Sequence, residues 1–141
     1  MIYLAQTDTT VGFLSENKEE LLKIKPRNKK PFLLTTTTFK TLKKLARVPK
    51  IYKKMVRRAK KTTFIYPNKK AIRVIKDSEH QKFLKEFDYL YSTSANKTSK
   101  DYEEEFAKRV ADVIIEDYRG LSQKKASSLI KLSKDVKKKL R

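Results

Sequence analysis

Residues 62–75 read TTFIYPNKKAIRVI, and this stretch decides the class of fold. Two runs rich in Thr, Phe, Ile and Val surround Pro67 and Asn68, residue types that favour turns. We therefore expect the runs 62–66 and 71–75 to pair as an antiparallel hairpin. A hairpin inside a longer series of strands predicts a sheet that is not purely parallel.

Similar β-rich runs lie on both sides of this hairpin, and stretches with apolar residues at helical spacing separate most of them. Strands that alternate with helices predict an α/β fold. Together with the hairpin, the pattern predicts one twisted, mixed parallel and antiparallel sheet with flanking helices. The other expected strands are 2–5, 32–38, 89–93, 110–115 and 128–132. The expected helices include residues 21–24, 39–45, 51–59, 83–87 and 102–110.

The residue counts exclude several kinds of site. The 141 residues include no cysteine and a single histidine, His80. Disulfides, thiolate metal sites, cysteine nucleophiles and multi-histidine metal sites are therefore excluded, and we expect no metal site. We expect His80 at the surface, without a role. The length fits one domain, which we place at 1–133, followed by a solvated basic tail at 134–141.

Positive charge is concentrated in one part of the chain. The net charge is +20, and residues 21–76 contain 20 basic residues and no acidic one. Such a block attracts phosphate-bearing partners: nucleic acid, a nucleotide or an anionic membrane. A solvated lysine-rich surface without a partner is the alternative. No apolar run is long enough for a transmembrane span or a secretory signal, so we expect a cytoplasmic protein that does not bind membranes.

Three polar segments follow or precede expected strands. Residues 6–12 (QTDTTVG) come directly after the first strand, where α/β sheets bind ligands. Residues 24–31 (IKPRNKKP) hold four cations and two prolines that restrict the backbone around them, and 91–96 (YSTSAN) ends a strand in small hydrogen-bonding groups. Each segment also has an ordinary interpretation, as turn, helix cap or exposed loop.

The order of these segments resembles the YrdC-like family, the threonylcarbamoyl-adenylate synthases. The family's Thr-Asp-Thr and Gly positions are matched by Thr7, Asp8, Thr9 and Gly12, and its Lys-x-Arg motif by Lys25 and Arg27. Further matches are Lys30-Pro31-Phe32, Thr63, Ala71-Ile72-Arg73-Val74, the intact Ser-Thr-Ser-Ala-Asn block at 92–96, and Ser127 within a strand-like segment.

The resemblance implies a reaction and a set of site residues. L-Threonine, bicarbonate and ATP would give threonylcarbamoyl-adenylate and pyrophosphate, and partner proteins would use the product to modify tRNA. ATP is then a substrate, with magnesium on its phosphates. No catalytic residue is identified. The implied ATP-binding residues are Lys25, Arg27, Lys30, Ser94 and Asn96, and the implied threonine-binding residues are Thr7, Thr63, Arg73, Ser92 and Ser127.

The chain also departs from the family pattern. Gln6 and Ala126 replace prolines, Val11 replaces an aromatic residue, and Lys60-Lys61 stand where a Pro-Gly pair is usual; 97–99 also differs. Most family members carry a helix before the first strand, so we expect the flank beside that strand to need other cover.

A non-catalytic RNA-binding protein is the alternative function. Lysines outside the matched motifs exceed what a small ligand can contact, and they favour tRNA or double-stranded RNA, or serve solubility alone. The residues singled out for RNA are Lys43, Lys44, Lys53 and Lys54.

Overall fold

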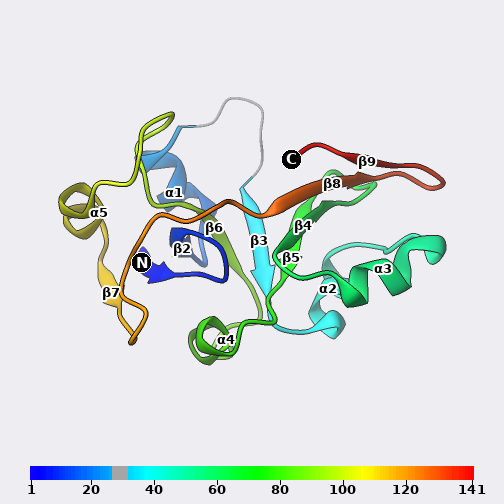
Figure 1. Cartoon of the computed structure of the whole chain (residues 1–141), viewed down its shortest axis with the longest axis horizontal. Coiled ribbons are helices and arrows are strands. Elements are labelled where there is room, and N and C mark those ends of the chain that lie inside the picture. The colour runs from blue at the N-terminus through cyan, green and yellow to red at the C-terminus, as the bar shows by residue number, and fades with distance from the viewer. Residues whose placement is uncertain (27–31) are drawn as a thin grey trace.

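One mixed β-sheet organises the chain (Figure 1). The structure is a computed structural model that describes residues 1–26 and 32–141, and within them nine strands follow the order β7-β1-β2-β6-β3-β5-β4-β8-β9. The pairs β1/β7, β3/β5 and β4/β8 are parallel and the other neighbours are antiparallel. The strands are β1 (Tyr3–Gln6), β2 (Val11–Ser15), β3 (Leu33–Thr36), β4 (Thr62–Ile65), β5 (Ala71–Val74), β6 (Leu90–Ser94), β7 (Val113–Ile115), β8 (Ser128–Leu132) and β9 (Lys137–Lys139).

Short helices flank the sheet, and several begin at a side-chain cap. The described residues form α1 (Lys18–Ile24), α2 (Phe39–Leu45), the 3₁₀ helix η1 (Lys50–Tyr52), α3 (Lys53–Arg58), α4 (Ser78–Leu84) and α5 (Glu104–Val110). Asn17, Thr38 and Asp77 accept hydrogen bonds from backbone N–H groups in the first turns of α1, α2 and α4. Together with the mixed sheet, these helices confirm the predicted α/β fold.

Alternation along the strands divides the core between the two faces of the sheet. In β1 and β2, Leu4 and Phe13 pack with α1 and α5, whereas the neighbouring Ala5 and Leu14 pack with α4. The β1–β2 half of the sheet is therefore covered on both faces.

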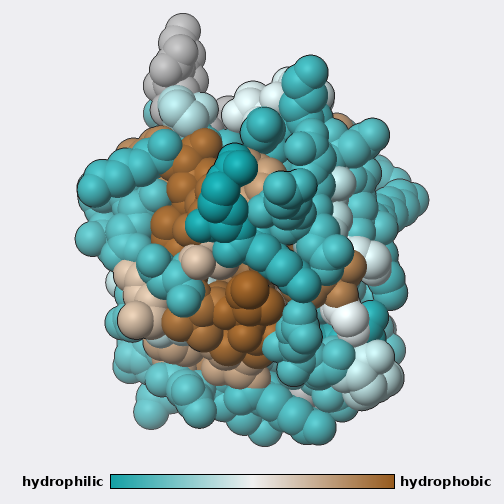
Figure 2. Space-filling view, turned by 90° about the vertical axis from the view of Figure 1, so that its left-hand side faces the viewer, coloured by the Kyte–Doolittle hydropathy of each residue, from teal (hydrophilic) through white to brown (hydrophobic). Residues whose placement is uncertain are grey.

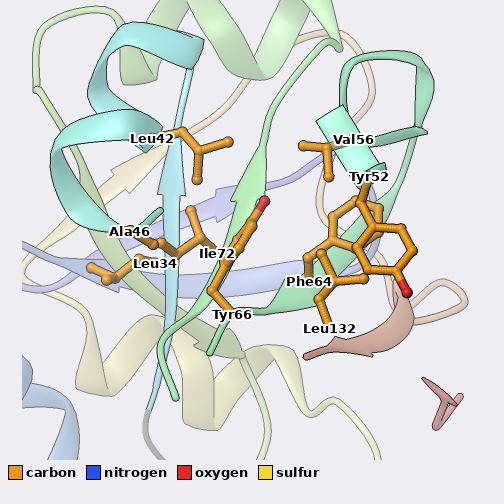
Figure 3. Packing of buried hydrophobic residues seen from close by; sticks show 9 residues of the cluster. All are labelled: Leu34, Leu42, Ala46, Tyr52, Val56, Phe64, Tyr66, Ile72 and Leu132. Atoms are coloured by element: carbon orange, nitrogen blue, oxygen red, sulfur yellow. The ribbon is translucent and has the colours of Figure 1, made fainter. Parts of the chain in front are cut away.

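The other half of the sheet is packed against helices on one face. Leu34, Phe64 and Ile72 of β3, β4 and β5 pack with residues of α2 and α3, as Figure 3 shows. Arg73, next to Ile72, consequently points to the opposite face. That opposite face is where the polar residues of these strands gather.

Most predicted strands are present within one or two residues. The predicted hairpin is β4/β5, with Phe64 opposite Ile72. The run 110–115 was wrong in its first half, because residue 110 ends α5 and the strand begins at Val113. Strand β2 was not predicted: all five of its residues are buried, so it lacks the polar alternation of a half-buried strand.

The basic C-terminal segment is part of the sheet. The side chains of Lys137–Lys139 are exposed, as expected for a solvated tail, but their backbone pairs with β8. Arg141 is also anchored, because its Nε donates to the Ser127 carbonyl at 2.7 Å.

The flank near the N-terminus, α5 and β7 carries an apolar patch surrounded by polar residues, shown in Figure 2. Met1, Leu22 and Ile114 are among the exposed large apolar side chains of the chain. No helix in the described part of the chain is long and apolar enough to cross a membrane.

Candidate functional site

A cleft of about 1090 Å³ lies on the face of the sheet opposite α2 and α3. Its lining comes from the β1–β2 loop, the residues after α1, the strands β4, β5 and β6, and the start of β8. Sheet alternation explains this: Thr63 and Arg73 point into the cleft because their neighbours Phe64 and Ile72 point into the core.

Arg73 is a buried cation at one end of the cleft. Its Nη2 lies 3.0 Å from Asp8 Oδ1, and both side chains are almost completely buried. Its Nη1 donates to Thr63 Oγ1 at 3.2 Å. Burial lowers the pKa of the Arg73 guanidinium, and the Asp8 carboxylate opposes that shift. Asp8 does not line the cleft, so it holds Arg73 from behind.

A second guanidinium reaches the same end from the C-terminal segment. Thr63 Oγ1 and Ser127 Oγ are 2.8 Å apart, and Arg141 Nη2 donates to Ser127 Oγ at 3.0 Å. The positive charge of Arg141 also lowers the pKa of Arg73, so the two cations are electrostatically coupled. Two guanidinium groups joined through two hydroxyls form a natural site for a carboxylate or phosphate.

Lys25 occupies the other end of the cleft. Its ammonium donates to Ser94 Oγ at 2.9 Å and to Asn96 Oδ1 at 2.8 Å, and it also contacts Thr93 Oγ1 at 3.2 Å. These contacts tie the end of α1 to the end of β6. Lys25 therefore fixes the Ser94 and Asn96 side chains while adding a positive charge to the cleft wall.

The β1–β2 loop forms the wall between these two ends. Thr7 Oγ1 donates to the Thr10 carbonyl at 2.6 Å and accepts from Thr9 N at 3.1 Å, which closes the loop on itself. Gly12 gives this wall room: an added Cβ would lie 3.1 Å from both Thr7 Cγ2 and the Thr93 carbonyl oxygen. Ser92 on β6 lines the cleft beside it.

The polar side chains of the lining share one chemical character. Among the described residues that line the cleft they are cations, hydroxyls and one amide, with no carboxylate and no histidine, and apolar residues such as Leu33, Ile65 and Leu129 complete the lining. The described residues likewise contain no cluster of three groups suited to hold a metal ion. Such a cleft favours an anionic ligand whose metal ion, where one is needed, arrives bound to the ligand's own phosphates.

Comparison with known proteins agrees with this architecture at the level of fold. No protein-family model matches the sequence, and a search of curated proteins found no match. Among solved structures, P. abyssi Sua5 complexed with L-threonine is similar, with a TM-score of 0.78 and 17% sequence identity over 99% of this chain and 49% of that one. E. coli YciO is similar with a TM-score of 0.73 and 18% identity, over 99% of this chain and 82% of that chain. The fold matches that of YrdC-like proteins.

Further similarity extends to a larger protein. Full-length HypF in its phosphate- and nucleotide-bound form has a TM-score of 0.77 and 16% identity, over 99% of this chain and 26% of that chain. The present chain spans about half the length of the Sua5 chains it matches. The YrdC-like fold is thus shared with proteins that also contain other parts.

The structure brings most of the predicted small-ligand residues of the YrdC-like fold into one cleft. Those that line it are Thr7, Lys25, Thr63, Arg73, Ser92, Ser94, Asn96 and Ser127. The predicted ATP-binding residues Arg27 and Lys30 lie outside the described residues. The predicted RNA-binding residues Lys43, Lys44, Lys53 and Lys54 are exposed on α2 and α3, away from the cleft.

Arg141 is a cleft residue that the sequence did not indicate. We had expected it in a solvated tail, and its role depends on the β8–β9 pairing that turns the chain back toward Ser127. Arg141 and Ser127 are 14 positions apart, so no local sequence pattern indicates that they are in contact. The sequence predicted the strand 128–132 but no partner strand after it, so nothing indicated that Arg141 returns to Ser127.

A segment outside the cleft holds the β1–β2 loop in place. Arg119 Nη2 donates to the Gln6 carbonyl at 3.1 Å, and Nη1 donates to the Thr7 carbonyl at 3.3 Å. Asp117 fixes the same guanidinium, with 2.7 Å between Nη2 and Oδ2. Further along, Ser122 N donates to Gln6 Oε1 at 2.8 Å. We call residues 117–124 the strap, since they pass over the loop that carries Thr7.

His80 was wrongly expected at the surface. It is 1% exposed, and among the described residues neither ring nitrogen has a hydrogen-bond partner. Burial, with smaller contributions from the positive Arg73 and Arg119, lowers the pKa of His80 to about 3. The ring packs near Phe83 on the same helix, which explains its burial: it occupies an apolar position of α4.

Proposed function

We propose that the chain is a threonylcarbamoyl-adenylate synthase, which forms threonylcarbamoyl-AMP from L-threonine, bicarbonate and ATP for the modification of tRNA. The observation that carries the proposal is the acid-free lining of the cleft, with a guanidinium end and an ammonium end separated by a hydroxyl-rich wall. Similarity in fold to Sua5 complexed with L-threonine, and to HypF in a nucleotide-bound form, supports it.

The guanidinium end suits threonine. Arg73 would bind the α-carboxylate, while Thr63 and Ser127 offer hydroxyls to the remaining polar groups of the amino acid. Thr7 and Ser92 add hydroxyls along the wall. The amine of threonine would then face the middle of the cleft, where bicarbonate has to meet it.

The ammonium end suits ATP. Lys25 would offset phosphate charge, Ser94 and Asn96 would contact the nucleotide, and Arg27 and Lys30 are proposed to complete the phosphate site. Magnesium would enter with the phosphates as part of the substrate. Arg141 lies in the same lining and adds a further positive charge to the cleft.

The chemistry in this arrangement is positioning and charge neutralisation. The threonine amine forms a C–N bond with bicarbonate, and water leaves to give a carbamate. A carbamate oxygen then forms a bond to the α-phosphorus of ATP, and the bond to pyrophosphate breaks. ATP, bicarbonate and the carbamate are anions and threonine carries a carboxylate, so preorganised cations lower the cost of bringing these groups together.

A pyrophosphate-exchange assay tests the proposal. ATP formed from labelled pyrophosphate should require L-threonine and bicarbonate together. Asn96→Ala and Ser127→Ala each remove one hydrogen-bonding group from opposite ends of the cleft, and we expect each to lower the exchange rate by roughly tenfold to a hundredfold.

Glu86→Ala is the matched control, because Glu86 is exposed after α4 and outside the cleft lining. Exchange that proceeds equally well without threonine or without bicarbonate would refute the synthase. Folded protein with no exchange at all would favour the alternative function, a non-catalytic RNA-binding protein.

A further inference from the structure

Residues 40–47 and 50–57 repeat one pattern. KTLKKLAR and KIYKKMVR both read Lys-x-x-Lys-Lys-x-x-Arg, and we call them the cationic octads. In both, the third and seventh residues are buried and the four cations are exposed. The first octad contains all but the first residue of α2, and the second contains η1 and most of α3.

The two octads cover the same part of the core. Leu42 and Ala46 from the first, and Tyr52 and Val56 from the second, belong to one cluster of buried residues around β3, β4 and β5 (Figure 3). Since the four cations of each octad lie at positions other than the buried third and seventh, both octads turn them outward from the same face of the sheet. Arg58, Lys60 and Lys61 extend this exposed basic surface.

Helix stabilisation does not account for the pattern. Cations in the last turn of a helix interact favourably with its dipole, which would explain Lys43, Lys44 and Arg57. Neither α2 nor α3 has an acidic residue in its first turn, where Lys40 and Lys53 instead place positive charge. Those two lysines act against the dipole.

The octads also lack counter-charges within the described part of the chain. Among the ion pairs of residues 1–26 and 32–141, none involves a residue of either octad. Like charges three and four positions apart repel one another and destabilise a helix. The surface therefore has a standing electrostatic cost that a polyanion would remove by binding.

We propose that the two cationic octads form a binding surface for the phosphate backbone of tRNA. The cations are numerous, exposed and arranged in two rows on neighbouring helices, which suits an extended series of phosphates rather than one small anion. The choice of tRNA among nucleic acids rests on the proposed function. The inference that the octads bind phosphates does not depend on that function.

The surface and the cleft lie on opposite faces of the sheet. Arg73 lines the cleft, while its neighbour Ile72 packs with the octads' buried residues. RNA bound to the octads would therefore leave the cleft open to ATP and threonine. Binding and synthesis are separable on this geometry, so one can be changed without the other.

A membrane surface fits the octads less well. Helices that lie on membranes insert a broad apolar face, but the apolar residues at the third and seventh positions of both octads are buried in the core. Ile51, 63% exposed, is an isolated apolar residue among the cations. The octads therefore present positive charge but no apolar face that could insert into a membrane.

Charge reversal in each octad tests the proposal. Lys43→Glu/Lys44→Glu and Lys53→Glu/Lys54→Glu are made separately and combined, and binding of unmodified tRNA is measured by fluorescence anisotropy from low to physiological salt. The slope of log K against log salt should fall by about 3 in the combined variant, since each lost phosphate contact removes roughly 0.7 to 0.9. Each pair should contribute about half.

The matched control reverses four exposed lysines elsewhere, Lys18, Lys23, Lys82 and Lys85, and changes the net charge equally. A control that flattens the slope as much as the octad variant overturns the proposal, because net charge alone would then explain binding. Equal affinity for duplex DNA overturns the assignment to tRNA. The surface is assigned to lipid instead if the octads are required for binding to phosphatidylserine vesicles and tRNA cannot displace the protein from them.

Pyrophosphate exchange is measured on the same variants. It should remain within about twofold of the wild-type rate, since the octads lie outside the cleft. Failure of exchange in the wild-type protein would refute the proposed function but leave the salt slopes to decide the phosphate-binding surface.

Discussion

At the scale of single residues, buried charge is balanced on the protein side of the cleft. Asp8 contacts Arg73 from behind and the Thr63 hydroxyl accepts from its Nη1, so part of the guanidinium is satisfied before any ligand arrives. Removing the carboxylate alone would leave a buried cation without its partner, a change that typically costs about 3 to 5 kcal/mol. The pair therefore serves stability and preorganises the cleft at once.

His80 gives a prediction about acid stability. Its pKa is about 3 in the folded protein, against about 6.5 for an exposed histidine. Between these values the unfolded chain binds a proton that the folded protein does not, so stability falls as the pH decreases below about 6.5. From pH 6 to pH 4 this group should remove about 2 to 3 kcal/mol from the free energy of unfolding.

Chemical denaturation of the wild type and of His80→Leu at both pH values isolates this contribution, since the carboxylates are common to both proteins. The variant should lose less stability on acidification. Because His80 is the single histidine, its imidazole signal in ¹⁵N NMR provides an independent check. A ring that titrates near pH 6.5 in the folded protein would contradict the prediction.

At the scale of elements, the strap controls the loop that carries Thr7. Arg119 binds two successive backbone carbonyls with one rigid fork, whereas lysine has a single ammonium on a flexible stem. Arg119→Lys keeps the charge, so we expect the fold to persist while the strap loosens. The amides of Val11 and Ser122, which bond strap and loop together, should exchange with solvent at least about tenfold faster.

Hydrogen exchange followed by NMR measures this effect. The Lys25 amide, which bonds to the Leu21 carbonyl at the end of α1, serves as an internal reference that should not change. Arg109→Lys is the matched variant, because Arg109 is exposed on α5 outside the strap. Unchanged exchange at Val11 and Ser122 in Arg119→Lys would show that the strap is held by its other contacts.

The sequence predicted the elements whose signal is local and missed those that depend on distant partners. The β4/β5 hairpin has its own turn, and the block at 92–96 has its own composition. By contrast, β9 is three lysines whose strand conformation comes entirely from pairing with β8, and the strap has no periodicity. Arg141 and Arg119 were missed for this reason, and His80 because one polar residue gave no indication of burial.

At the scale of the whole molecule, charge and chemistry are divided between two faces. The acid-free stretch supplies cations to the cleft on one face and to the octads on the other. Because this stretch contains no acidic residue, the net charge of +20 is concentrated around it. Self-repulsion of this kind weakens the compact state at low ionic strength.

Salt should consequently stabilise the protein. Raising sodium chloride from about 0.05 to about 0.5 M shortens the screening length several-fold, and we expect the thermal midpoint to rise by roughly 3 to 5 °C, equivalent to about 1 kcal/mol. The combined octad variant should start from a higher midpoint and gain less from salt. A midpoint independent of salt in the wild type would argue against net repulsion.

The connection that contains the strap is also a site where a protease could cut the chain into two fragments. The strap lies in the connection from β7 at one edge of the sheet to β8 near the other, and Lys124 and Lys125 within that connection are exposed. A tryptic cut there would divide the chain into two fragments, with Thr7 and Arg73 on one and Ser127 and Arg141 on the other. A small molecule bound in the cleft would contact both fragments and hold them together. After the cut, slower dissociation of the two fragments would therefore show that the cleft is occupied.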